Sequence, residues 1–147
     1  MDLRLIYNEY ISTLNDMGYW RLAPFVAPGV VHNSSNAMTP DEYGQMILNS
    51  IKDFKDFEFK VETLVVEEDK HGVTVGSNNG EGNGRVAARL RLSYERPRTQ
   101  SGASRIVFYE HVFYRFEKGK IARVWSLVDL PKENEEMVEL LLIGVQT

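Results

Sequence analysis

Two alternating segments near the C-terminal end of the chain constrain its fold most. Residues 105–116 and 120–130 alternate between two kinds of side chain, and Glu117-Lys118-Gly119 lies between them. A period of two is typical of β-strands whose two faces differ. A glycine in the third position of a three-residue loop suits a type I turn followed by a glycine bulge. The pattern therefore predicts a long antiparallel hairpin.

The register of this hairpin decides which side chains share a face. If Phe116 pairs with Lys120, Glu110 lies opposite Ser126 on a mostly apolar face. The remaining members of that face include Phe108, Val112, Tyr114, Val124 and Val128. The second face carries Tyr109, His111, Phe113, Arg115, Ile121, Arg123, Trp125, Leu127 and Asp129. We expect the first face to lie inside, and the second to lie outside and contact a second copy of the chain. A shift of one residue would exchange the two faces.

The rest of the sequence predicts helices first and further strands after them. Helical spacing of apolar residues, helix-start signals or apolar clusters indicate helices over residues 2–16, 19–26, from 40 onward and around 137–141. Thr39 and Glu42 form a capping box around Pro40, which suits a first helical position. Strands are expected over residues 30–33, 57–65 and 85–96, with Tyr94 on the apolar face of the last. Helices followed by antiparallel strands define an α+β domain.

Composition limits the functions that need to be considered. The 147 residues are 43% apolar and carry a net charge of −4, so we expect one domain over residues 1–147 and no nucleic-acid partner. There is no cysteine, no apolar run of membrane-spanning length and no signal peptide, which favours a cytoplasmic protein without membrane contact. The glycine-rich residues 77–84 lack the features of a phosphate-binding loop, and the three histidines lack metal-ligand spacing.

Several short motifs together resemble the SnoaL-like polyketide cyclases. These are Tyr7-Asn8-Glu9-Tyr10, Val31-His32-Asn33, Thr39-Pro40-Asp41-Glu42-Tyr43 and the turn Arg115-Phe116-Glu117-Lys118-Gly119-Lys120-Ile121. That family belongs to the nuclear transport factor two-like superfamily, with ketosteroid isomerase and scytalone dehydratase, and the second and third motifs look most like fungal members. The resemblance implies a cone-shaped α+β barrel with a curved antiparallel sheet around N-terminal helices. It also implies a cofactor-free cyclase or isomerase for a small, hydrophobic, polycyclic intermediate derived from a polyketide or terpenoid.

The family's acid–base pair is missing from this chain. The cyclases' histidine falls at Val112 and their aspartate at Ser126, whereas their asparagine matches Asn33. We therefore expect Glu110 to be the acid–base group, because an apolar cavity raises the pKa of a carboxyl. Tyr114 and Asn33 would stabilise developing negative charge. The expected substrate-binding residues are Ser126, Tyr94, Phe108, Val112, Val124 and Val128.

Each assignment has an alternative. Glu110 could be a structural carboxylate paired with Arg89 or Arg91, Tyr114 could be a core aromatic, and Asn33 could simply end a strand. A non-catalytic module for small-molecule binding or dimerisation would keep the fold and lose the chemistry. A dehydratase using His111 and Asp129 would require the opposite register. His32 should point away from Asn33, so the two are not expected to act together.

Overall fold

The computed structural model describes residues 1–69 and 81–129. The elements are α1 (Leu3–Asn15), β1 (Val26–His32), α2 (Pro40–Ile51), β2 (Glu58–Glu68), β3 (Gly84–Glu95), β4 (Arg105–Glu117) and β5 (Lys120–Asp129). The predicted C-terminal helix and most of the glycine-rich loop lie outside the described residues. No helix in the described part of the chain is both long and apolar enough to cross a membrane.

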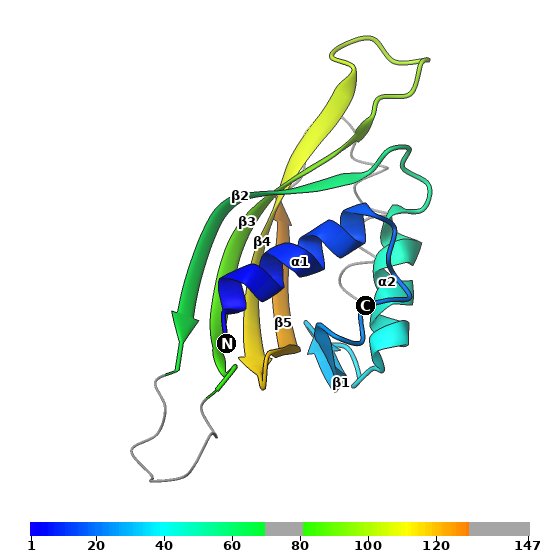
Figure 1. Cartoon of the computed structure of the whole chain (residues 1–147). Coiled ribbons are helices and arrows are strands. Elements are labelled where there is room, and N and C mark those ends of the chain that lie inside the picture. Colours follow the sequence, from blue (N-terminus) through cyan, green and yellow to red (C-terminus); the bar gives the residue numbers. More distant parts are fainter. Residues whose placement is uncertain (70–80, 130–147) are drawn as a thin grey trace, which may run out of the picture.

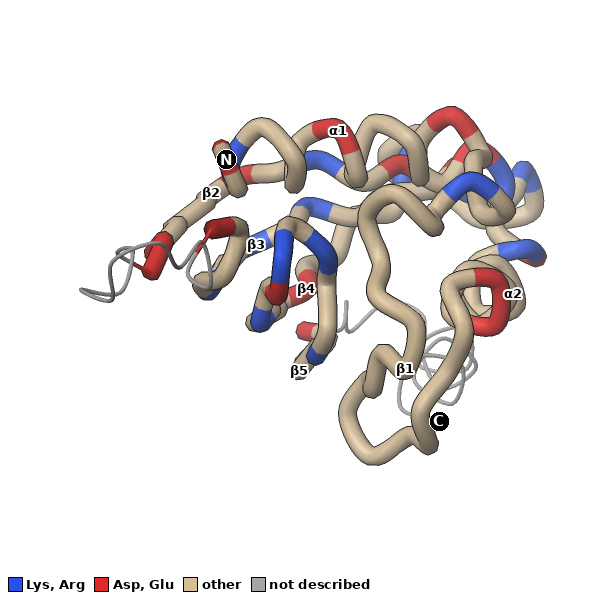
Figure 2. Tube along the Cα trace, turned by 60° about the horizontal axis from the view of Figure 1, so that its bottom comes forward, with Lys and Arg blue, Asp and Glu red and all other residues tan. Residues whose placement is uncertain are grey.

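The five strands form one curved sheet in the order β1-β5-β4-β3-β2, and α1 lies across its concave side while α2 stands beside the β1 edge (Figure 1). This arrangement confirms the predicted α+β cone. The sheet differs in two details from the expected antiparallel barrel: β1 pairs with β5 in parallel, and the sheet does not close. Basic and acidic residues are interspersed along the chain rather than gathered on one element (Figure 2).

Local signals at their first turns fix where both helices begin. The Asp2 carboxylate accepts a hydrogen bond from the Leu5 amide, 3.1 Å away, and begins α1. The Thr39–Glu42 capping box predicted for α2 is present, with bonds of 2.9 and 3.1 Å. The short helix expected over 19–26 is wrong: turns occupy its first part, and β1 begins at Val26. Pro24 lacks the amide hydrogen that a helix would use there.

The β4–β5 turn differs from the predicted three-residue loop. It is a two-residue turn, and Lys118 and Gly119 both have positive φ, 51° and 77°, as in a type I′ turn. Long-range contacts hold this geometry, because the Lys118 amide donates to Asn83 Oδ1 and the Gly119 amide donates to the Gly82 carbonyl, both at 2.8 Å. A bulge at Ala122 then shifts the register by one residue, and antiparallel pairing continues along the rest of the hairpin.

The turn and the bulge change the paired residues but preserve the two faces of β4, and those of β5 beyond Ala122. Val112 lies opposite Ser126, and Glu110 lies opposite Val128 rather than Ser126. The expected inner face is inside, since Val112, Tyr114 and Val124 are at most 3% exposed. Ile121 was expected on the outer face, and the structure corrects this: the bulge turns it inward, and it is fully buried. The outer face leaves Phe113, Trp125 and Leu127 53%, 43% and 72% exposed.

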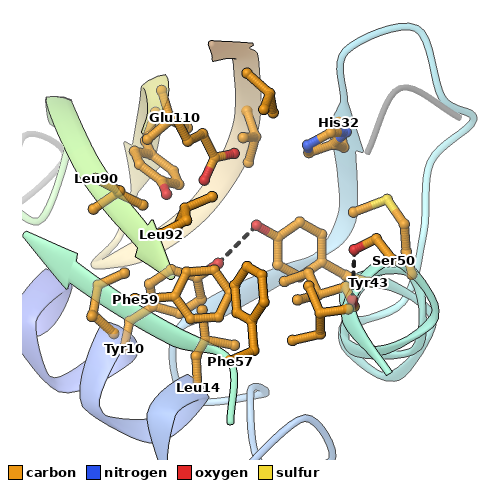
Figure 3. A pocket seen from close by; sticks show the side chains of 18 residues that line it. Tyr10, Leu14, His32, Tyr43, Ser50, Phe57, Phe59, Leu90, Leu92 and Glu110 are labelled. Atoms are coloured by element: carbon orange, nitrogen blue, oxygen red, sulfur yellow. Dashed lines mark hydrogen bonds between the residues drawn. The ribbon is translucent and has the colours of Figure 1, made fainter. Parts of the chain in front are cut away.

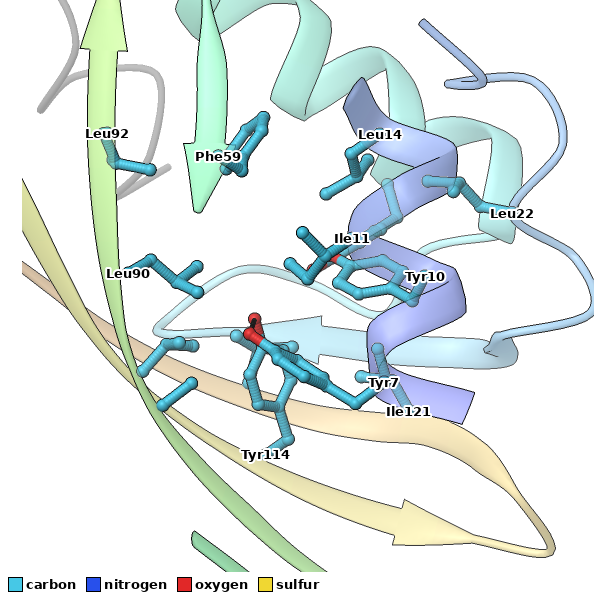
Figure 4. Packing of buried hydrophobic residues seen from close by; sticks show 14 of the residues in the cluster. Tyr7, Tyr10, Ile11, Leu14, Leu22, Phe59, Leu90, Leu92, Tyr114 and Ile121 are labelled. Atoms are coloured by element: carbon cyan, nitrogen blue, oxygen red, sulfur yellow. Dashed lines mark hydrogen bonds between the residues drawn. The ribbon is translucent and has the colours of Figure 1, made fainter. Parts of the chain in front are cut away.

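The core lies between α1 and the concave side of the sheet. Tyr7, Tyr10, Ile11 and Leu14 of α1 face Leu90, Leu92, Tyr114 and Ile121 of the strands (Figure 4). The side chain of Asn15 fastens the end of α1 to β2 by two bonds with the backbone of Phe59, of 2.7 and 2.8 Å. The helix is thereby held over the sheet, and the space beyond it, toward α2, is bounded on three sides.

Candidate active site

A small cavity lies between the concave sheet, α1 and α2 (Figure 3). Its volume is about 50 Å³, and its lining consists of Tyr10, Ile11, Leu14, His32, Tyr43, Met46, Ile47, Ser50, Ile51, Phe57, Phe59, Leu90, Leu92, Glu110, Val112, Tyr114, Val124 and Val128. A single water needs about 10–15 Å³ on this measure. The space therefore holds a few waters, and a ring-sized molecule requires lining side chains to move apart. Its wall is apolar apart from a few convergent polar groups, which is typical of ligand sites.

Most of the predicted site residues on the hairpin line this cavity. Glu110, Tyr114, Val112, Val124 and Val128 are all in its wall. The other three predicted contacts on the inner face, Phe108, Tyr94 and Ser126, are buried but lie outside the lining. Phe108 and Tyr94 instead belong to an aromatic cluster with Phe54 and Phe57, in which the Phe54 and Tyr94 ring centroids are 4.7 Å apart.

Glu110 projects from the middle of β4 into the cavity (Figure 3). Burial raises the pKa of its carboxyl, and a short hydrogen bond from the Ser126 hydroxyl to Glu110 Oε2 partly offsets this. Arg89, a possible ion-pair partner, instead pairs with Glu62 and donates to His111 Nε2. No lysine or arginine of the described residues forms an ion pair with Glu110. The group is thus an isolated carboxyl whose environment favours the protonated form.

Four tyrosine hydroxyls form two pairs around Glu110. Tyr7 and Tyr114 are 3.1 Å apart, and Tyr10 and Tyr43 are 2.8 Å apart, oxygen to oxygen. Burial is the main cause that raises the pKa of each of these phenols, so all four stay neutral. In each pair one hydroxyl donates to the other, which leaves the second proton available to another acceptor. Each pair therefore keeps one hydroxyl proton for a further acceptor, and Tyr43 of α2 and Tyr114 of β4 are the members that line the cavity from these two elements.

Asn33 lies outside the cavity wall and holds two strands together. Its residue has a positive φ of 50° and leaves the strand after His32. The Ser126 amide donates to Asn33 Oδ1 at 2.8 Å, and Asn33 Nδ2 donates to the Ser126 carbonyl at 3.2 Å. The side-chain amide thus prolongs the β1–β5 ladder. Asn33 is not placed to stabilise charge in the cavity, and we do not include it in the proposed chemistry.

His32 is the cavity residue that the sequence interpretation missed. It is 4% exposed and lines the cavity from β1, and its ring centroid lies 6.4 Å from that of Tyr43. Burial, followed by the charge of Arg123, lowers the pKa of its imidazole to about 4. Val30, two residues earlier, is apolar and buried. Period two places His32 on that same face, and this was the available signal.

The outer face holds the other histidine and aspartate that were considered. His111 is exposed there and accepts a 3.1 Å bond from Arg89 Nε, and Asp129 pairs along the ladder with Tyr109. Glu110, not His111, faces the cavity, whereas the dehydratase hypothesis requires His111 and Asp129 to act there together. Within residues 1–69 and 81–129, no three side chains of histidine, cysteine, aspartate or glutamate gather as metal ligands would.

The fold and the site together describe an α+β cone that encloses an apolar cavity beneath its helices. The family model for the SnoaL-like polyketide cyclases matches residues 4–132, and the chain belongs to that family. A comparison with curated protein sequences finds no match. A SnoaL-like polyketide cyclase from Agrobacterium tumefaciens is 31% identical, with 88% of this chain and 92% of that one covered and a TM-score of 0.66.

Two more distant solved structures share the fold. A candidate hydroxylase from Streptomyces galilaeus, AclR, is 16% identical, with a TM-score of 0.64 over 93% of this chain and 96% of that one. A candidate ketosteroid isomerase from Kribbella flavida is 18% identical, with a TM-score of 0.57 over 89% of this chain and 80% of that one. These matches are bacterial, and the closer likeness to fungal enzymes stays a prediction.

Proposed function

We propose that this chain is a cofactor-free cyclase or isomerase that uses Glu110 as its proton donor. Its substrate would be a small, hydrophobic, polyketide- or terpenoid-derived carbonyl compound that becomes a ring or rearranges within one. The observation that carries this proposal is a buried carboxyl without a cationic partner in the wall of an apolar cavity. A carboxyl whose pKa is raised by burial is suited to act as a general acid.

The surroundings of Glu110 support proton transfer to a carbonyl oxygen. Ser126 occupies Oε2 of the carboxyl, so the other oxygen can hold the proton and point it at a ligand. Tyr43 and Tyr114 supply neutral donors for the oxygen on which negative charge develops. Apolar side chains make up most of the wall, so charges that develop there are weakly screened and each of these interactions is strengthened. The family's missing histidine and aspartate are therefore replaced by a different set of groups.

Two small ketones test this function without the natural substrate. 3-Cyclohexenone reports isomerisation and heptane-2,6-dione reports aldol ring closure, because each product is a conjugated enone with strong ultraviolet absorbance. We expect Glu110→Gln to lower the rate of the active substrate by about 10²-fold or more, the usual contribution of a general acid. Glu117→Gln is the matched control on the same strand, since Glu117 is exposed and pairs with Arg115.

The alternative is a non-catalytic module that binds small molecules. Equal rates for the wild type and Glu110→Gln would remove Glu110 from the mechanism. If the wild type binds both ketones and accelerates neither reaction, the binding module is the better description. Binding is measured separately from turnover by tyrosine fluorescence, because tyrosines line the cavity.

We also propose that the outer sheet face pairs with a second copy of the chain. Phe113, Trp125 and Leu127 are exposed side by side on β4 and β5, next to Val65 of β2, which is 60% exposed. Exposed apolar patches of this kind mark interaction surfaces. A two-fold axis would bring the same patch of each copy together.

A further inference from the structure

His32 and Glu110 face the same space from different strands. Figure 3 shows the His32 ring and the Glu110 carboxyl directed into the cavity, with Tyr43 below and between them. His32 comes from β1 and Glu110 from β4, and β5 separates these two strands in the sheet. The sheet is curved across these strands (Figure 1), and both side chains line the same cavity. A ligand in the cavity would therefore contact both groups.

The His32 ring lacks the partner that a structural core histidine has. Its Nδ1 is fully enclosed, and no other residue in the described part of the chain supplies it with a hydrogen-bond partner. Buried polar atoms are usually satisfied, and an exception in a native structure requires an explanation. Because His32 lines the cavity, a ligand that moves the lining side chains apart is a candidate partner for this ring.

Several hydrogen bonds fix the backbone around His32, although β1 is an edge strand of the sheet. The His32 amide donates to Ser35 Oγ at 2.9 Å, and His32 pairs with Val124 of β5. The Asn33 side chain adds two bonds to the Ser126 backbone directly after it. These contacts fix the backbone from which the ring enters the cavity wall. Supporting contacts of this kind are typical of a side chain that acts on a ligand, and a side chain that only fills the core does not need them.

We propose that His32 is the base of the reaction, and that its neutral imidazole removes a proton from the carbon next to the substrate carbonyl while Glu110 protonates the carbonyl oxygen. This inference rests on the proposed function. The carbon–hydrogen bond breaks and a nitrogen–hydrogen bond forms, and the freed electron pair becomes the enol double bond. The Glu110 oxygen–hydrogen bond breaks as the enol oxygen–hydrogen bond forms. No oxidant or reductant is needed.

The step converts two neutral groups into an ion pair across the cavity. The imidazolium and carboxylate attract each other strongly in an apolar space, which stabilises the enol intermediate. Isomerisation is completed when the imidazolium returns its proton to another carbon of the enol and the carboxylate recovers the proton from the enol oxygen. The two groups are then neutral again and ready for the next cycle.

Burial prepares both groups for these roles. It lowers the pKa of His32 to about 4 and raises that of Glu110, so it favours the unprotonated base and the protonated acid. Among the titratable side chains described, Tyr10, Tyr43, Tyr114 and Glu110 line the cavity with His32, and the charge of Arg123 of β5 acts on its imidazole. Those around Glu110 are Tyr7, Tyr10, Tyr43, Tyr114 and His32. We therefore expect kcat/KM to fall below about pH 4 as His32 is protonated, and to fall again where Glu110 ionises.

The test compares His32→Gln, Glu110→Gln and His111→Gln on 3-cyclohexenone in deuterium oxide. Absorbance gives the rate of isomerisation, and NMR gives deuterium uptake at the carbon next to the carbonyl. We expect His32→Gln to lower kcat/KM by about 10²-fold or more, to stop deuterium uptake and to lose the acid limb of the pH profile. His111→Gln alters the exposed histidine of the outer face and should match the wild type. Each variant is checked for folding by circular dichroism.

Failures of the two proposals are distinguishable. Full activity of His32→Gln together with a large loss in Glu110→Gln would overturn the role of His32 and leave that of Glu110. Full activity of both variants, or no turnover by the wild type, would overturn the proposed function and this inference with it.

A second measurement does not depend on turnover. Nitrogen-15 NMR of the wild-type imidazole should show a neutral ring down to about pH 4. The unprotonated nitrogen should shift when phenol, a small ring with a proton to donate, occupies the cavity. Broadening of the Tyr43 and Val124 signals shows that phenol has entered the cavity. A nitrogen signal that then does not shift, or a ring that is protonated at pH 7, would overturn the assignment.

Discussion

Acid should lower the free energy of unfolding through His32, because burial in the cavity wall lowers the pKa of its imidazole. The pKa of His32 is about 4 in the folded chain and about 6.5 when it unfolds, so unfolding takes up a proton between these values. The sign follows from this: the stabilisation is complete above pH 6.5 and is lost as the pH falls through 4. At 1.36 kcal/mol per pKa unit, the total loss is about 3 kcal/mol, of which about 2 kcal/mol is lost by pH 5.

Glu110 acts in the opposite direction, because its folded pKa is raised. Its contribution is complete at low pH and is lost as the pH rises, so variants must be compared rather than the wild type alone. Urea unfolding at pH 7.5 and pH 5.0 gives the free energy of unfolding for the wild type, His32→Gln and His111→Gln. We expect His32→Gln to lose about 2 kcal/mol less than the wild type on acidification, and His111→Gln to behave as the wild type. An unchanged pH dependence in His32→Gln would refute the reasoning.

Three further substitutions test the fold and the proposed assembly. Thr39→Ala removes the capping box of α2 and should cost about 1 kcal/mol in urea unfolding. Gly44→Ala should destabilise by about 1–3 kcal/mol or more, although alanine favours helices, because a β-carbon there would lie 1.9 Å from the Tyr19 carbonyl oxygen. A gain in stability would contradict that contact. Leu127→Asp should convert the proposed dimer to monomers in light scattering, while the exposed Leu5→Asp should not; a wild-type monomer would exclude the dimer.

The hairpin shows what alternation can and cannot predict. Period two correctly placed Glu110 and Tyr114 on the inner face, because a change of two residues in pairing leaves the faces unchanged. The bulge at Ala122 was not predictable from the same pattern, and it reversed the side of Ile121. Contacts of Lys118 and Gly119 with the distant residues Asn83 and Gly82 help to set the turn, and no local rule includes them.

The site shows how a family match can misdirect a correct rule. Alternation correctly puts His32 and Asn33 on opposite sides, and the match assigned the inner side to Asn33. The positive φ of Asn33 and its bonds to Ser126 put that residue outside the cavity wall, which makes His32 the inner one. The apolar neighbour Val30 carried the right information, because it shares a face with His32. The unsatisfied Nδ1 could be seen only in three dimensions.

The parallel pairing of β1 with β5 also determines when the cavity can form. Asn33 and its partner Ser126 are 93 positions apart, so the wall that holds His32 has no strand to pair with until most of the chain is available. Contacts this distant in sequence form late, because a long loop must close before they contribute. During synthesis on a ribosome, helix α1 and strands β2 to β4 can associate first. The imidazole of His32 and the carboxyl of Glu110 would then come together only in the last stage of folding. A chain that is still being made would therefore lack the proposed acid–base pair.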